Sequence, residues 1–280
     1  MYSTTNNTNT TAAAPPSYQD TVADRGYDGP FIPDDFNYST KVFSCELPVR
    51  AHFINRVMNI LSLQLCTTLF SILLAFQNTT FHNFMINHMG LFYISMIVSL
   101  ITCFWLSLMP RLENYGDASN EEIPWYVYGK RGQYVLLGVF TMAESWMVTL
   151  FTLSYRYEIV LRAIVVTTIL VLGISILSRF DRLAFLVESN SSIYYWLNCS
   201  LWIMIGLGMS SFFIPWNNTW DLVYGWGGAI LFSIYLLIDL QLVLRKVYCD
   251  EEIRCAMMIY LDIINLFLSI LRIMSHTSDD

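Results

Sequence analysis

The sequence predicts an all-α membrane protein, a bundle of seven transmembrane helices. Its 280 residues are 55% hydrophobic and only 13% charged, about half the charged fraction of a soluble domain. Long apolar runs alternate with short polar gaps, and no soluble domain interrupts them. A membrane β-barrel would instead show short segments of alternating hydrophobicity. The net charge of −7 is gathered in the tails and one loop, so we expect no nucleic-acid partner.

Seven apolar stretches make up the predicted membrane domain, residues 51–280. Each is close to the ~20 residues that a helix needs to cross ~30 Å of hydrocarbon. They cover residues 58–76, 89–109, 134–153, 159–177, 193–213, 222–244 and 256–274. In the sixth stretch, Gly225, Gly227 and Gly228 would let a neighbouring helix approach closely.

Basic residues in the loops predict the orientation of the bundle. Twelve of the fifteen Lys and Arg residues lie before the first stretch or in the second, fourth and sixth loops. Cytosolic loops of membrane proteins carry such an excess of positive charge. We therefore expect the N-terminus in the cytosol and, with seven spans, the C-terminus on the far side.

Residues 1–50 are predicted to form a disordered cytosolic tail, because Thr, Asn, Pro and Asp dominate and aliphatic residues are few. The tail contains a PPSY motif formed by Pro15, Pro16, Ser17 and Tyr18. Two prolines favour an extended polyproline II segment, which the aromatic grooves of WW domains bind. A WW-domain ubiquitin ligase is therefore one expected partner, and a chance match in a proline-containing tail is the alternative.

Three acidic residues fall inside the apolar stretches: Glu144 in the third, Asp239 in the sixth and Asp262 in the seventh. A charge at the centre of a bilayer costs at least ~2.5–3.5 kcal/mol on insertion scales, so each such residue requires a structural or functional reason. Arg162 and Arg272 lie near span ends, where a long side chain can reach the interface.

The seventh stretch carries a polar stripe made of Asp262, Asn265, Ser269 and Arg272. Their spacing places them on one face of an α-helix, with Ile, Leu and Phe on the other faces. Such a stripe is expected to face the interior of the bundle or a water-filled cavity.

Asp239 and Asp262 lie on consecutive antiparallel helices joined by a short loop, so their carboxyls can sit at similar depth. Two adjacent carboxyls in a medium of low dielectric cannot both ionise cheaply, and such a pair titrates as a unit. A shared proton would hold the helices together, and its loss would push them apart. This predicts a pH-sensitive gate whose carboxylates contact Ca²⁺ transiently in the open form. The alternative is a structural pair, or one aspartate facing interfacial water, without a role in transport.

Six segments are distinctive: FIPDDFNYST (31–40), IYYWLN (193–198), LWIMIG (201–206), YGWGGAILF (224–232), DEEIRCAMM (250–258) and YLDIINLFLSILRI (260–273). They resemble the Bax-inhibitor family, also called the transmembrane Bax inhibitor motif or Lifeguard family, and especially its budding-yeast and other fungal members. The last of these is the most specific, and the resemblance covers most of the chain.

The resemblance implies a seven-helix fold with the C-terminal helix at its centre, and a pH-sensitive calcium leak from an intracellular store. It assigns the pH-sensing pair to Asp239 and Asp262 and a candidate latch to Arg111, although Pro110 departs from the pattern there. Glu144 matches an acidic position of the family, and with Asn265 and Arg272 it would supply buried polar support. Calcium would be the permeant ion, and no cofactor is expected.

The resemblance also implies links to programmed cell death and the unfolded-protein response, and a place in the endoplasmic reticulum membrane; the vacuolar and mitochondrial membranes are alternatives. Two other functions stay open. A non-conducting regulator would bind stress or cell-death machinery. An intramembrane aspartyl protease would also use two membrane aspartates, but the YD and GxGD signatures of such enzymes are missing around Asp239 and Asp262. We therefore do not expect an enzyme.

Overall fold

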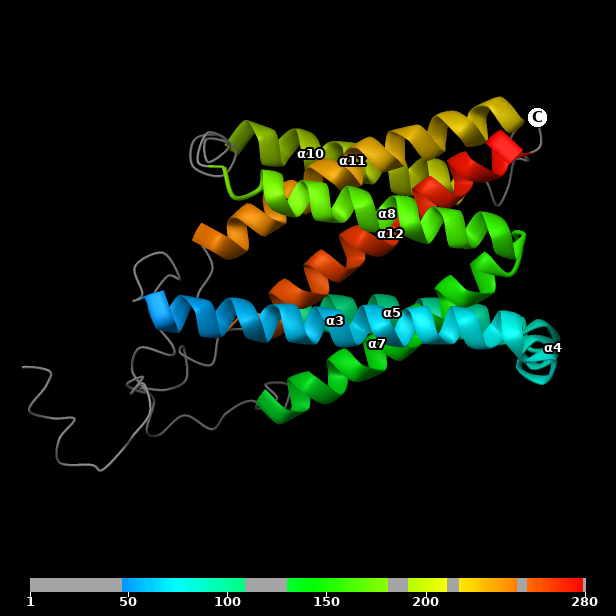
Figure 1. Cartoon of the computed structure of the whole chain (residues 1–280), viewed down its shortest axis with the longest axis horizontal. Coiled ribbons are helices and arrows are strands. Elements are labelled where there is room, and N and C mark those ends of the chain that lie inside the picture. The colour runs from blue at the N-terminus through cyan, green and yellow to red at the C-terminus, as the bar shows by residue number, and fades with distance from the viewer. Residues whose placement is uncertain (1–46, 109–129, 181–190, 211–216, 246–250, 279–280) are drawn as a thin grey trace, which may run out of the picture.

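A computed structural model describes residues 47–108, 130–180, 191–210, 217–245 and 251–278. Eight α-helices lie within these ranges (Figure 1). They are α3 (Leu47–Gln77), α4 (Thr79–Asn87), α5 (Gly90–Leu108), α7 (Lys130–Thr152), α8 (Tyr157–Leu177), α10 (Ser191–Ser210), α11 (Asn218–Arg245) and α12 (Glu252–Ser278).

The all-helical membrane fold is confirmed: α3, α5, α7, α8, α11 and α12 are each long and apolar enough to cross a bilayer. α10 coincides with the fifth expected span but is not among these six, so the count of seven remains a prediction. Figure 1 shows α3 beginning at one end of the bundle and α12 finishing at the other. We call these the cytosolic end and the far end, following the distribution of positive charge.

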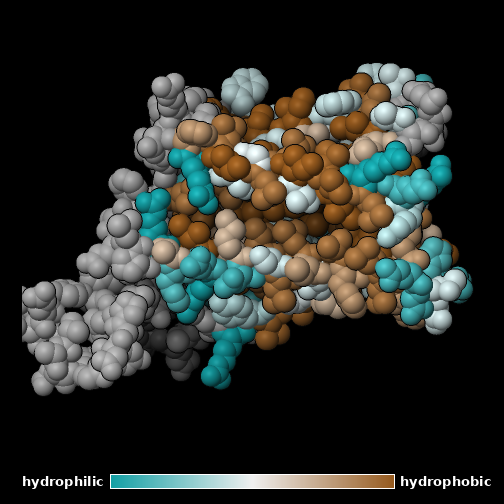
Figure 2. Space-filling view, in the orientation of Figure 1, coloured by the Kyte–Doolittle hydropathy of each residue, from teal (hydrophilic) through white to brown (hydrophobic). Residues whose placement is uncertain are grey.

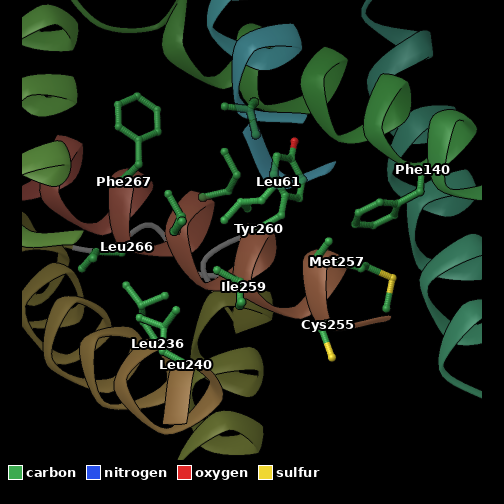
Figure 3. Close-up of a cluster of buried hydrophobic side chains, with 14 of the residues drawn as sticks. Leu61, Phe140, Leu236, Leu240, Cys255, Met257, Ile259, Tyr260, Leu266 and Phe267 are labelled. Atoms are coloured by element: carbon green, nitrogen blue, oxygen red, sulfur yellow. The ribbon is translucent and has the colours of Figure 1, made fainter. Parts of the chain in front are cut away.

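α12 lies at the centre of the bundle, where it packs against α3, α5, α7, α8 and α11. Its residues Met257, Ile259, Tyr260, Leu266 and Leu271 are among the most deeply buried in the structure. Figure 3 shows this cluster, to which α11 contributes Leu236 and Leu240, α3 Leu61 and α7 Phe140. The Phe140 and Tyr260 rings meet edge to face at 5.9 Å between centroids. A helix enclosed in this way can keep polar groups away from lipid.

Small residues on α11 allow α12 to approach closely. A Cβ atom built on Gly228 would lie 2.5 Å from Oγ of Ser269, and one on Gly225 would lie 3.1 Å from Cγ1 of Ile273. Gly227 instead faces Met204 of α10, at 3.8 Å. Gly225 and Gly228 therefore support the expected close approach of a neighbouring helix, whereas Gly227 faces another element.

Two elements differ from the sequence-based expectation. α3 begins at Leu47, before the expected end of the tail, with Pro48 in the first turn, where proline fits a helix. The polar gap after α3 contains the short helix α4, which Asn78 caps by accepting hydrogen bonds from the backbone of Thr80 and Phe81. Its aromatic residues pack on α7, and the Phe81 and Trp146 rings lie 6.0 Å apart. This packing supports a helix too short to be stable alone.

Candidate functional site

Two buried carboxyl groups, those of Asp239 and Asp262, lie at the contact between α11 and α12. The Asp239 and Asp262 side chains lie within hydrogen-bonding reach of each other. Each residue is only 8% exposed. A carboxylate only accepts hydrogen bonds, so a hydrogen bond between them requires a proton on one of the two groups. Oδ2 of Asp262 has no further partner in the described parts of the chain.

The sequence brings the two aspartates together through the apolar stripes on either side of them. On α11, Leu236 and Val243 lie one turn before and after Asp239 and are buried in the central cluster. On α12, Ile259 and Leu266 lie one turn before and after Asp262 and are buried in the same cluster. Burying these stripes fixes the register of the two helices, and the carboxyls meet as a consequence. Tyr235, one turn before Asp239, lies near both.

Glu144 lies on the other side of α12, at the contact between α7 and α5. It is 6% exposed, and Oγ of Ser99 donates a hydrogen bond of 2.6 Å to its carboxyl. No basic side chain pairs with it among the described residues. Its position is thus separate from the Asp239–Asp262 pair.

A cavity of about 480 Å³ connects Glu144 with the polar stripe of α12. Asn265, Ser269 and Arg272 line it together with Glu144, whereas Asp262 does not. Oγ of Ser269 donates to the backbone carbonyl of Asn265 at 2.8 Å, and its oxygen can still accept a hydrogen bond. The polar stripe follows the contact with α11, where Asp262 meets Asp239, Ser269 lies against Gly228 and Arg272 meets Asp221. Its last three residues, Asn265, Ser269 and Arg272, also line this cavity.

Arg272 belongs to an ion-pair cluster toward the far end. Its guanidinium lies 3.2 Å from Oδ1 of Asp221, and Nε2 of His276 lies 2.9 Å from Oδ2 of the same carboxylate. The guanidinium also stacks 4.7 Å from the centre of the Tyr224 ring. Burial raises the pKa of Tyr155, and the nearby Arg272, which also donates a hydrogen bond to it, opposes that shift. Arg272 is thus held by several partners rather than extended to the interface.

Asp221 and His276 were not predicted as site residues. Both lie outside the apolar cores of their helices, where ionisable residues are common, so the sequence alone gives no reason to single them out. The available signal is positional: Asp221 stands in the first turn of α11, where a negative charge is favourable, and His276 stands in the last turn of α12, where a positive charge is favourable.

A chain of hydroxyl groups, also unexpected, joins α3, α7 and α12. The Tyr260 hydroxyl lies 2.8 Å from Oγ1 of Thr68, which lies 2.9 Å from Oγ of Ser145. Nε2 of Gln64 donates to Thr141 one turn away, at 3.0 Å. All five residues are buried. These bonds satisfy polar groups that lipid could not satisfy, and they fix α12 against α3 and α7.

Several predicted residues lie outside the described part of the chain: Arg111, and Pro15, Pro16 and Tyr18 of the PPSY motif. In the ranges that the structure describes, no three His, Cys, Asp or Glu side chains gather as a metal site would require. The transient contact of Ca²⁺ with Asp239 and Asp262 stays a prediction, and it would use these two carboxylates alone.

Comparison with known proteins agrees with this architecture. Residues 50–279 match the protein family described as "Inhibitor of apoptosis-promoting Bax1". The chain is 47% identical to Bax inhibitor 1 of Saccharomyces cerevisiae over 269 residues, 89% of this chain and 91% of that protein. It is 28% identical to Protein lifeguard 4 of Mus musculus, covering 89% and 95% of the two chains. It is also 28% identical to the Golgi anti-apoptotic protein of Vaccinia virus (strain Lister), covering 87% and 93%. The expected fungal resemblance is confirmed, and the chain is an integral membrane protein that belongs to the Bax-inhibitor family.

Proposed function

We propose that this protein is a pH-sensitive calcium leak of an intracellular membrane, and that the Asp239–Asp262 pair is its gate. The observation that carries the proposal is the close approach of two buried carboxyls on neighbouring helices. A hydrogen bond between them exists only while the pair holds a proton. It therefore links the protonation of the pair directly to the distance between α11 and α12.

Loss of the shared proton would place two negative charges in contact. Two unit charges 4 Å apart repel by about 4 kcal/mol at an effective dielectric constant of ~20. The closed pair holds one more proton than the separated pair, so raising the pH favours separation. The freed carboxylate oxygens are ligands of the kind that Ca²⁺ prefers. The leak is accordingly small at low pH and rises with pH.

The cavity beside α12 supplies the rest of the proposed path. It offers a carboxyl, an amide and a hydroxyl from Glu144, Asn265 and Ser269, and Arg272 lies at its boundary. Asp221 neutralises that guanidinium and so reduces its repulsion of a cation. A cation released from the pair would thus meet oxygen ligands on its way toward the far end.

The test is Ca²⁺ flux through liposomes that contain the purified full-length protein, measured from pH ~6 to ~8. Asp239→Asn and Asp262→Asn should each abolish the dependence on pH. The matched control is Glu158→Gln, which removes a carboxylate exposed on the surface and should leave the pH profile unchanged. Wild-type protein that is correctly folded but passes no more Ca²⁺ than empty liposomes would contradict the proposal.

In the cell, such a leak would regulate calcium homeostasis, the unfolded-protein response and programmed cell death from the endoplasmic reticulum membrane. Support comes from relatives named Bax inhibitor 1 and Golgi anti-apoptotic protein. Release of stored calcium measured in cells that carry wild type or Asp262→Asn would test this link, and equal release from both would contradict it.

The same names support a second candidate, a non-conducting regulator that binds stress or cell-death machinery. The two candidates differ in the residues on which they depend. A docking function should survive Asp239→Asn and Asp262→Asn. If a WW-domain ubiquitin ligase is the partner, Tyr18→Ala should remove its binding while leaving the calcium flux of the liposomes unchanged.

A further inference from the structure

A cleft between α3 and α8 lies apart from the carboxyl pair and the polar cavity. Both helices pack against α12, and Figure 1 shows α12 in the gap between them. At the far end the two helices meet, with the Phe76 and Tyr157 rings 5.2 Å apart. Along the cleft lie two hollows that differ in chemistry, one midway along the helices and one at the cytosolic end. The cleft is therefore closed at one end and open at the other.

The first hollow, here called the apolar groove, has a volume of about 210 Å³. Leu65 and Leu69 of α3 form one wall, Val171 and Leu172 of α8 form the other, and Phe267 of α12 lies at the floor. Thr68, Thr167 and Thr168 also line the groove, and each hydroxyl already bonds the backbone carbonyl four residues earlier. The groove carries no charge and faces the hydrocarbon of the membrane. It suits a flexible hydrocarbon chain.

The second hollow, here called the basic mouth, has a volume of about 410 Å³. Arg50 and Asn55 of α3 line it together with Ser178 and Arg179, which directly follow α8. No acidic side chain lines it, and neither arginine forms an ion pair within the described ranges. Guanidinium groups bind phosphate through paired hydrogen bonds, and the cytosolic leaflet is rich in anionic lipids. The basic mouth suits a phosphate group.

The two hollows lie at the spacing of the parts of a lipid. Arg50 of the basic mouth and Leu65 of the apolar groove are fifteen residues apart on α3, which is ~22 Å along a helix. One leaflet with its headgroups is also ~20 Å thick. Figure 2 shows brown side chains over the region between α3 and α8 and teal side chains toward both ends of these helices.

We propose that the cleft between α3 and α8 binds one anionic phospholipid of the cytosolic leaflet. Its phosphate lies between Arg50 and Arg179, and one acyl chain lies in the apolar groove against α12. The groove residues Ile263 and Phe267 lie on a face of α12 different from that of Asp262, since each residue turns the helix by about 100°. The lipid site is therefore independent of the carboxyl pair and does not rest on the proposed calcium leak.

Native mass spectrometry of the full-length protein in detergent tests the proposal, with dioleoyl phosphatidic acid as the probe. Dioleoyl phosphatidylcholine has the same chains with a zwitterionic headgroup, and glycerol 3-phosphate has the phosphate without chains. We expect a one-to-one complex with phosphatidic acid at an affinity at least ~10-fold higher than with either comparison ligand. Equal affinity for the two phospholipids, or for phosphatidic acid and glycerol 3-phosphate, would overturn the proposal.

Variants separate the two halves of the site. Arg50→Gln combined with Arg179→Gln should reduce the affinity for phosphatidic acid to that for phosphatidylcholine. Thr168→Phe should fill the apolar groove and lower the affinity for both phospholipids. The matched controls are Arg156→Gln, an exposed arginine near the far end, and Ile169→Phe, an exposed neighbour of Thr168. Controls that weaken binding as much as the site variants, or site variants that bind like wild type, would contradict the proposal.

Discussion

Two polar sites on α12, ten residues apart, stabilise their ionisable side chains by different means. Asp262 meets another acid, and the Asp239–Asp262 contact depends on a proton. Arg272 meets an acid of opposite charge, and its contact with Asp221 is supported by His276 and by the Tyr224 ring. The first site is enclosed, whereas Asp221 is 34% exposed in the second. A proton-dependent contact responds to pH, and a charge-compensated contact responds to salt.

The largest expected difference between the two sites is in the dependence of stability on pH. While the pair keeps a proton that two exposed aspartates would have released, the folded state binds more protons than the unfolded state. Stability then falls as the pH rises, by up to about 1.4 kcal/mol per pH unit, and the slope flattens as the folded pair loses its proton. Unfolding in mixed detergent micelles should show this slope in wild type and lose it in Asp262→Asn. An equal slope in both proteins would break the comparison.

The close contact of α11 with α12 should give the next largest effect. Gly228→Ala would place a Cβ atom 2.5 Å from Oγ of Ser269, and overpacking of this kind costs about 2 kcal/mol. Gly227→Ala is the matched control, since its Cβ atom would lie 3.8 Å from the nearest side-chain atom. The free energy of unfolding, measured in the same micelles, should be lower for Gly228→Ala than for Gly227→Ala. Adding Ser269→Ala to Gly228→Ala should restore part of the stability, and no restoration would contradict the assigned clash.

Arg272→Gln tests the charge-compensated site. Loss of the guanidinium leaves Asp221 with His276, and because Asp221 is partly exposed, solvent reduces the cost to about 1 to 1.5 kcal/mol. The difference from wild type should shrink as salt is added. Arg156→Gln removes an ion pair on the exposed surface and should have no measurable effect. Our assignment of the two sites would be reversed if added salt changed the unfolding free energy of Asp262→Asn relative to wild type but left that of Arg272→Gln unchanged.

The smallest expected effect concerns the hydroxyl chain between α3, α7 and α12. Tyr260→Phe removes the hydrogen bond to Thr68 and should cost about 1 kcal/mol, equally at every pH between 6 and 8. Thr68 keeps its bonds to Ser145 and to the backbone of Gln64, which limits the loss. Tyr93→Phe, at an exposed position on α5, is the control. A cost that changes with pH would indicate that this chain is coupled to the carboxyl pair.

Composition and periodicity predicted most of the fold because the bilayer demands long apolar helices. The positions of Asp239, Asp262 and Glu144 could likewise be predicted to matter, since charge inside an apolar helix is expensive. The sequence could not show which groups the polar stripe of α12 meets. Asp262 meets Asp239 and Arg272 meets Asp221, both on α11, and which neighbour of α12 faces the stripe depends on the packing of the whole bundle.

Other features were beyond sequence reasoning for a different reason. α4 is too short to be recognised by periodicity, and it is held by the contact of its aromatic residues with Trp146. The apolar groove and the basic mouth combine residues of α3 and α8 that are about a hundred positions apart in the sequence. Leucine, threonine and arginine at such positions are ordinary in a membrane helix, and only their meeting across the cleft makes them distinctive.

The central claim is that the proton shared by Asp239 and Asp262 holds the leak closed. Infrared spectroscopy of the protein in liposomes detects the protonated carboxyl directly, and Ca²⁺ flux can be recorded on the same sample as the pH is raised from ~6 to ~8. We predict that one carboxyl band, absent in Asp262→Asn and retained in Glu144→Gln, disappears over the pH range in which the flux rises. A flux that rises while this band persists would contradict the claim.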